Sequence, residues 1–200
     1  MARSPAAKSR PDTPQPPRKP RADAARNRAL LIETAKACFA QSGTATTLEE
    51  IARAAGVGIG TLYRHFPTRD ALVEQVYRDA LDRLATDAER LSQEQAPLEA
   101  LRQWLLLFID YIATKKLMHD LIATLAGGAA SLQAQTKPRL EGAITSLVER
   151  AKADGAIKPD VAPYDLLFAI GGLAYMGAAS DWVPRARGMV DILIAGIKRA

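Results

Sequence analysis

The chain has 200 residues, of which 48% are hydrophobic and 24% charged, which is enough for one large or two small domains with a substantial core. Its formal net charge is +5, and residues 1–22 carry six basic residues against one aspartate. The single cysteine excludes an internal disulfide, and the N-terminus lacks the apolar core of a secretory signal. The longest apolar run, residues 166–180, is short for a membrane span. We therefore expect a cytoplasmic protein with no membrane partner.

The composition favours an all-α fold. Ala and Leu dominate, aromatic residues make up only 6% of the chain, and no run alternates Val, Ile or Thr in the manner of a strand. We predict about nine helices, divided into an N-terminal three-helix head over residues 23–67 and a helical body over residues 68–200.

Residues 1–22 form a basic segment that contains six prolines. Such a segment buries too little apolar surface to offset its ordering entropy, so disorder is predicted. It is either an arm that adds salt-dependent affinity for nucleic-acid phosphates or a solvated tail.

A first helix is predicted over residues 23–41, and residues 46–72 then form two short helices joined by a turn. In the first of these two, apolar residues recur from Leu48 to Ala55 at helical spacing, and Thr47 and Glu50 have the spacing of a capping box. Gly56 supplies the left-handed residue that ends this helix.

The second short helix begins at residue 58 or 59 and ends before Pro67, because the residue preceding a proline avoids the helical region. Leu62 and Phe66 lie on its core side, while the other face is polar and aromatic. Two short helices with a glycine in the turn make a helix-turn-helix, whose second helix can enter a DNA major groove. A helical hairpin that merely packs explains the apolar spacing but not the polar and aromatic face.

The run IARAAGVGIGTLYRHFPTRDAL (residues 51–72) resembles the DNA-binding domain of TetR-type transcriptional repressors, and the resemblance covers about residues 26–76. It implies phosphate contacts from the N-terminus of the first short helix, the outward face of the second and the start of the next helix. It implies base contacts from the first turn of the second short helix and from Arg64, with Tyr63 also near a base. The residues implied are Thr47, Gly58, Ile59, Gly60, Thr61, Tyr63, Arg64, His65 and Arg69. Gly58 stands where many relatives have a capping Ser or Thr, and Ile59 can meet only a thymine methyl, so shape readout is expected to supplement sparse base contacts.

The body is predicted to contain a long helix from residue 68 to about 91, a buried helix from Pro97, a short helix over residues 118–126 and a helix from residue 131 or 136 to 153. Trp104, Tyr111, Thr114 and Lys115 resemble the ligand-binding body of one subgroup of this family. A lining for a small apolar or aromatic effector follows as a guess, with plain core as the alternative. Its residues are Trp104, Leu105, Phe108, Tyr111, Met118, Leu121, Ile122, Leu125, Phe168, Tyr175, Met176 and Trp182.

Two final helices are predicted over residues 162–180 and 183–199. The family dimerises through its last two helices, so these imply a homodimer, although they could instead complete the monomer core. The predicted interface residues are Leu166, Ile170, Gly171, Leu173, Ala174, Gly177, Met189, Val190, Leu193, Ile194 and Ile197.

No enzyme is expected. The two histidines, His65 and His119, lack metal-ligand spacing, and no nucleophile elbow, phosphate loop or dinucleotide fingerprint is present, so neither metal nor cofactor is predicted. The sequence therefore predicts a dimeric repressor that binds a near-palindromic double-stranded DNA operator and is released by a small-molecule effector. The alternative is an architectural DNA-binding protein that is ligand-free or controlled by a partner.

Overall fold

The computed structural model describes residues 20–125, 128–176 and 181–199. These described parts contain nine α-helices and one short 3-10 helix, in agreement with the predicted all-α fold. The helices are α1 (Pro20–Ser42), η1 (Gly43–Ala45), α2 (Leu48–Ala54), α3 (Ile59–His65), α4 (Arg69–Glu94), α5 (Pro97–Leu117), α6 (His119–Ala123), α7 (Gly128–Ala153), α8 (Pro163–Tyr175) and α9 (Trp182–Ile197).

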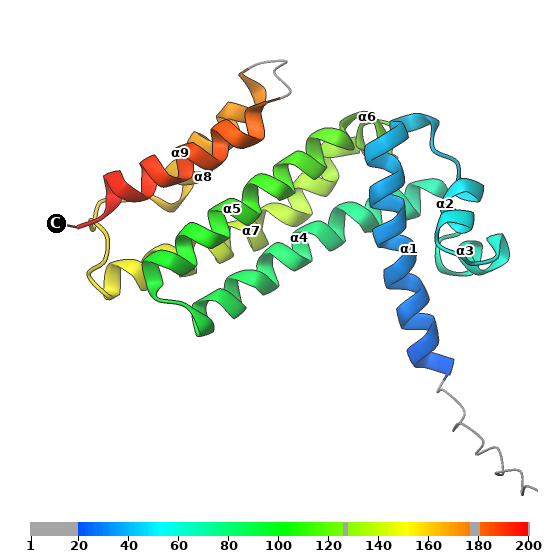
Figure 1. The fold of residues 1–200 in the computed structure, drawn as a ribbon, viewed down its shortest axis with the longest axis horizontal. Helices are drawn as coiled ribbons and strands as arrows, with labels where there is room; N and C mark the ends of the chain where they lie inside the picture. Colours follow the sequence, from blue (N-terminus) through cyan, green and yellow to red (C-terminus); the bar gives the residue numbers. More distant parts are fainter. Residues whose placement is uncertain (1–19, 126–127, 177–180, 200) are drawn as a thin grey trace, which may run out of the picture.

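Helix α4 connects the two parts of the molecule (Figure 1). Its N-terminal end lies beside α1, α2 and α3, which form the head, and the rest of it runs along α5 and α7 in the body. Helices α8 and α9 pack against each other and against α5 on the far side of the body. The long α4 therefore belongs to both the head and the body.

Local signals in the sequence place the ends of several helices. The Thr68 hydroxyl accepts a hydrogen bond from the backbone N–H of Ala71 at 3.1 Å, which caps α4. Pro97 occupies the first turn of α5, where its missing N–H costs nothing. Gly56 follows α2 with φ of 67°, the left-handed conformation that glycine adopts without penalty.

Several predicted boundaries shift. Helix α1 begins at Pro20, so residues 20–22 are helical rather than part of a disordered arm, and the rest of that segment lies outside the described residues. Helix α4 continues to Glu94, and α6 ends at Ala123. Helix α7 begins at Gly128 and passes through Pro138, so the proline does not mark its start.

The buried side chains form two clusters. The body cluster surrounds α5, where the Trp104 indole N–H donates to the Leu84 carbonyl at 2.9 Å. The head cluster combines side chains of the head with several from the body. Those of the head include Leu31, Phe39, Leu48, Ile51, Leu62 and Phe66.

The residues that the body contributes to the head cluster come from α4, from Met118 just before α6, from α6 itself and from α7. Met118, Leu121, Ile122 and Leu132 are all buried in it, and Leu125 packs against it. The head is therefore not a self-contained module, because α6 and α7 of the body complete its core.

Leu121→Ala tests this shared core. Leu121 is 1% exposed, and its truncation should lower the free energy of unfolding by about 2–5 kcal/mol through lost burial and a cavity. Leu117→Ala, four residues earlier and 56% exposed, is the matched control and should change it by less than about 0.5 kcal/mol. Urea unfolding followed by circular dichroism at one fixed protein concentration measures both. Equal effects of the two variants would contradict the packing of α6 into the head.

Candidate functional site

Helices α2 and α3 form a helix-turn-helix on the outside of the head (Figure 1). Ile51 of α2, Leu62 of α3 and Phe66 just after α3 are buried in the head cluster. These contacts turn the opposite face of α3 outward, where Ile59 is 37% and Tyr63 45% exposed. Ile59 and Tyr63 are four residues apart and so lie on one stripe of the helix surface.

The N-terminus of α2 carries the predicted capping box. The Thr47 hydroxyl accepts from the backbone N–H of Glu50 at 3.2 Å, and the Glu50 carboxylate accepts from the backbone N–H of Thr47 at 2.9 Å. This backbone hydrogen bond is the main reason that the pKa of Glu50 is lowered. The Thr47 hydroxyl proton remains available, so Thr47 can donate to a phosphate while it caps α2.

The first turn of α3 exposes backbone. Gly58 is the N-cap and has no side chain with which to cap the helix, and its φ of −69° is open to any residue. A Cβ atom added at Gly58 or Gly60 would meet nothing within 4 Å. Neither packing nor backbone conformation within the chain requires glycine at these two positions. Because glycine has no side chain, both positions allow another surface to approach the α3 backbone closely.

The remaining predicted residues of α3 differ in exposure. Arg64 is exposed, but its Nε–H donates to the Gly60 carbonyl at 3.2 Å, so the side chain lies back along its own helix. Thr61 and His65 are half-buried.

Arg69 at the start of α4 has a structural role that the sequence did not reveal. Its guanidinium donates to the carbonyl of Thr44 at 2.8 Å and to that of Thr46 at 3.2 Å, and it lies 5.7 Å from the centre of the Phe39 ring. Arg28 lies similarly over Phe66 at 5.3 Å. Both arginines thus make cation–π contacts across the head, with partners so distant in sequence that no local pattern points to them.

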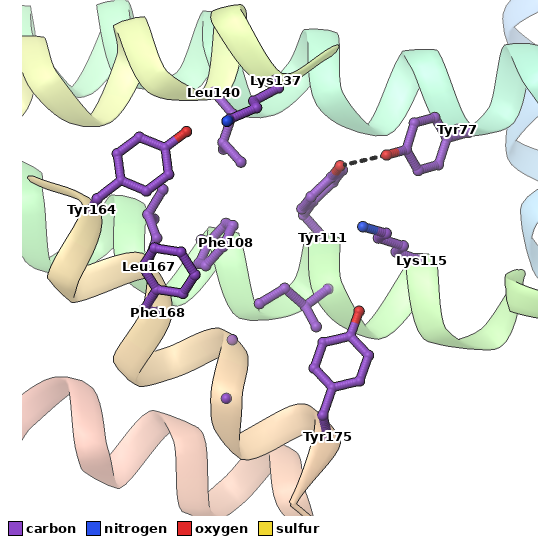
Figure 2. Close-up of a pocket in the computed structure, with 13 residues that line it drawn as sticks. Tyr77, Phe108, Tyr111, Lys115, Lys137, Leu140, Tyr164, Leu167, Phe168 and Tyr175 are labelled. Carbon is purple, nitrogen blue, oxygen red and sulfur yellow. Dashed lines mark hydrogen bonds between the residues drawn. The ribbon is translucent and has the colours of Figure 1, made fainter. Parts of the chain in front are cut away.

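A cavity of about 470 Å³ lies in the body between α4, α5, α7 and α8 (Figure 2). Its walls are mostly aromatic and aliphatic, with hydroxyl and amino groups at a few places. The lining residues are Tyr77, Phe108, Tyr111, Ile112, Lys115, Lys137, Leu140, Tyr164, Leu167, Phe168, Gly171, Gly172 and Tyr175.

Tyrosine hydroxyls mark the polar parts of this cavity. The hydroxyls of Tyr77 and Tyr111 lie 3.0 Å apart and form a buried hydrogen bond, drawn as a dashed line in Figure 2. Burial, and secondly the neighbouring Tyr77, raise the pKa of Tyr111. At another wall the Tyr164 hydroxyl donates to Glu141, and burial together with this bond raises the pKa of Tyr164 to about 12. With a raised pKa, the Tyr111 and Tyr164 phenols keep their protons near neutral pH and can donate hydrogen bonds.

Four of the twelve residues that the sequence suggested as an effector lining contact the cavity, namely Phe108, Tyr111, Phe168 and Tyr175. The other eight do not line it. Trp104, Leu105 and Trp182 fill the body core, Met118, Leu121, Ile122 and Leu125 pack on the head core, and Met176 points outward with 83% of its surface exposed.

Nine lining residues were not predicted, because they come from four helices that meet only in the fold. They are Tyr77, Ile112, Lys115, Lys137, Leu140, Tyr164, Leu167, Gly171 and Gly172.

The residues predicted for a dimer interface also need correction. Leu166, Ile170, Ala174, Val190 and Ile194 are buried inside the monomer, so they cannot meet a partner. The apolar stripes of α8 and α9 are thus used by the monomer core. Leu173, Leu193 and Ile197 are half-buried against that core, and Met189 is half-buried. Gly171 lies on the cavity wall, and Gly177 is outside the described residues.

The exposed side of α8 and α9 nevertheless carries small and apolar residues. We call the small and apolar residues of this exposed side the outer face, and they are Ala169, Met176, Gly188, Ile192, Ala195 and Gly196; Arg185, Arg187 and Asp191 of α9 are exposed as well. A Cβ atom added at Gly188 or Gly196 would meet nothing within 4 Å, so the chain leaves open space at both positions.

The described parts of the chain lack two further kinds of feature. No three His, Cys, Asp or Glu side chains gather there in a way that could hold a metal ion. None of the helices in these parts combines the length and the apolar character that crossing a bilayer requires.

Comparisons with known proteins agree with this geometry. Residues 31–76 match the family described as bacterial regulatory proteins, tetR family, and residues 96–199 match the SbtR-like transcriptional regulator C-terminal domain. Over 93 residues the chain is 40% identical to the HTH-type transcriptional repressor KstR2 of Mycolicibacterium smegmatis, and the match spans 46% of this chain but only 42% of that relative.

Two solved structures are similar over nearly their whole length. A TetR transcriptional regulator from Streptomyces coelicolor is 35% identical with a TM-score of 0.77, and the match covers 86% of this chain and 99% of that one. A TetR transcription regulatory protein from Mycobacterium vanbaalenii is 30% identical with a TM-score of 0.72. This match covers 90% of this chain and 99% of that one. These proteins are transcriptional regulators and not enzymes, and the similarity confirms the resemblance predicted from residues 51–72.

Tyr63→Phe tests the outward face of α3. The Tyr63 hydroxyl has no hydrogen-bond partner among the described residues, so its loss should leave unfolding unchanged. If it donates to a phosphate, DNA affinity should fall by about three- to tenfold on every sequence alike. Fluorescence anisotropy with specific and random duplexes measures this.

Tyr164→Phe makes the same chemical change in the body and serves as the control, with DNA affinity unaltered. A change of preferred sequence in Tyr63→Phe would contradict the assignment of this hydroxyl to the phosphate backbone.

Proposed function

The chain belongs to the TetR family of bacterial regulatory proteins, and from this we propose that it is a repressor that binds a near-palindromic DNA operator as a dimer and releases it when a small molecule fills the body cavity. The observation that carries the proposal is the position of Tyr77. This residue is 3% exposed in the head cluster, and it also lines the cavity.

The head supplies the groups that DNA binding needs. Helix α3 presents Ile59 and Tyr63 on an exposed stripe, and Gly58 and Gly60 let its backbone approach another surface. Thr47 adds a hydroxyl at the start of α2. Most of these contacts would reach phosphates, and few would read bases, so the sequence preference is expected to depend in part on DNA shape.

The response to an effector would act through α4. Its first turns pack in the head and its later turns in the body, and the Tyr77–Tyr111 hydrogen bond joins it to α5 at the cavity. A ligand that contacts this pair favours one placement of α4 over another, and thereby changes the position of α3. The ligand shifts the equilibrium only by the difference in its affinity for the two placements.

The dimer would form through the outer face of α8 and α9. Its small residues allow close approach of two helix pairs, and a two-fold axis would bring the same face of each protomer together. The amphipathic inner sides of these helices are already used by the monomer core, so the outer face is the surface left for a partner.

An architectural DNA-binding protein without an effector is the alternative, favoured only by the two glycines of the α3 first turn. Its DNA affinity would be independent of any ligand.

Operator selection with the purified 200-residue chain tests the DNA-binding proposal. Selected duplexes should contain a near-palindrome whose half-sites are separated by about 34–36 Å or a multiple of that distance, because two symmetry-related α3 helices must reach successive major grooves on one face of the duplex. Footprinting should show protection of both half-sites together. Protection of a single half-site by a species that sediments as a monomer would contradict the proposal.

Ile192→Arg tests the dimer face. Ile192 is 65% exposed on the outer face of α9, so the arginine should not disturb the monomer fold but would place two charges in an apolar interface. We expect a shift to monomer in sedimentation velocity and a fall of at least about tenfold in operator affinity. Leu117→Arg, on an exposed apolar position of α5, is the control and should remain dimeric. A dimeric Ile192→Arg would place the interface elsewhere.

A further inference from the structure

We infer that the body cavity binds an organic anion, with its carboxylate at Lys115 and a flat aromatic or polycyclic body beside Phe108. This inference rests on the effector response proposed above. The cavity has one wall of hydrogen-bond donors and other walls that are largely apolar (Figure 2).

The charge of the lining favours an anion. Two lysines line the cavity, and no aspartate or glutamate does. Lys137 is partly neutralised, because its ammonium lies 3.5 Å from the Glu141 carboxylate. The Lys115 ammonium has neither an ion pair nor a hydrogen bond among the residues that the structure describes. Lys115 therefore supplies a positive charge that only a ligand or solvent can balance.

The position of Lys115 in α5 has a simpler explanation that must be weighed. Lys115 and Lys116 occupy the last turn of α5, where positive charge is favourable because of the helix dipole. Lys116 makes use of that position, since its ammonium donates to the Ala174 carbonyl at 2.7 Å. Lys115 makes no such bond, and Figure 2 shows its ammonium pointing toward the Tyr111 side of the cavity.

The groups around Lys115 are also donors. In the Tyr77–Tyr111 pair one hydroxyl donates to the other, so the accepting hydroxyl keeps a free proton. The Tyr175 hydroxyl lies at the same end of the cavity (Figure 2). An ammonium can donate to a phenol oxygen, but none of these groups carries a negative charge. A carboxylate, which only accepts, can take hydrogen bonds from the ammonium and from the phenol protons and also balances the charge.

The rest of the cavity suits an aromatic body. Phe108 stacks with Trp104 and Tyr111, with ring centres 5.8 and 6.1 Å away, so its ring is held in place where it lines the cavity. Gly171 and Gly172 on the α8 wall have no side chains, and a Cβ at Gly171 would lie 3.9 Å from Ile112. A volume of about 470 Å³ is within the range of pockets that hold drug-sized molecules.

Matched probes test the inference on the purified 200-residue chain. Biphenyl-4-carboxylate and pyrene-1-carboxylate are compared by isothermal titration calorimetry with their primary amides, which have the same shape without the charge, and with 4-(aminomethyl)biphenyl as a cation. Each carboxylate should bind at least about tenfold more tightly than its amide, and the cation should bind most weakly.

Lys115→Met should remove the carboxylate preference and leave the affinity for the amide unchanged, which also shows that the cavity is intact. Lys115→Gln is the second variant and should behave in the same way. Lys137→Met is the matched control from the opposite side of the cavity, and because Glu141 already balances Lys137, it should change the carboxylate affinity by less than about threefold.

Three results would overturn the inference: equal binding of carboxylate and amide by the wild-type protein, a carboxylate preference that survives in both Lys115 variants, or no binding of any probe. Operator affinity without a probe is measured in parallel, so a failure of DNA binding is seen separately. Carboxylate binding through Lys115 that leaves operator affinity unchanged would uphold the anion site and refute the effector response.

Discussion

The structure depends on the burial of one helix in two cores. Leu72, Val73 and Val76 in the first turns of α4 pack with α1, α2 and α3, whereas Leu81 and Leu84 further along pack with α5. The helix is continuous over 26 residues between these cores, with no proline or glycine at which it could bend. A displacement of its body half therefore carries the head with it, because breaking either set of contacts would expose large apolar side chains.

The cavity lies where the two cores meet. Tyr77 belongs to the head cluster by burial and to the cavity by its position on the wall, and its hydroxyl bonds to Tyr111 of α5. The head cluster also receives Met118 and Leu121 from α6, immediately after α5 ends. A molecule in the cavity would thus contact α4 and α5 close to the point where both leave the body for the head, where a small change in packing is most directly passed to α3.

Local chemistry made much of the fold predictable from the sequence. The Thr47 cap, the glycine after α2 and the core side formed by Leu62 and Phe66 each depend on residues within four positions, and the structure has them as predicted. The cavity was less predictable, because Tyr77, Lys137 and Tyr164 come from three different helices. Trp104 illustrates the reason. A large aromatic residue in an apolar helix can either fill the core or line a pocket. The packing of α4 on α5 places Trp104 in the core, where its indole N–H bonds to the Leu84 carbonyl. The structural role of Arg69 could not be predicted for the same reason, since its partners Thr44 and Thr46 lie near it only in the folded chain.

Helix α8 connects the cavity to the opposite surface of the body. Its inner side contributes Gly171 and Tyr175 to the cavity wall, while Ala169 and Met176 point outward on the face proposed for the dimer. The cavity is therefore bounded by α4, which holds the head, and by α8, which would hold the partner protomer. Under the proposed function these two helices together set the distance between the two α3 helices of a dimer. Under the same proposal, an effector bound between α4 and α8 would contact both helices and so change the distance between the two α3 helices. Because linkage is reciprocal, operator binding would then alter the affinity for the effector by the same factor.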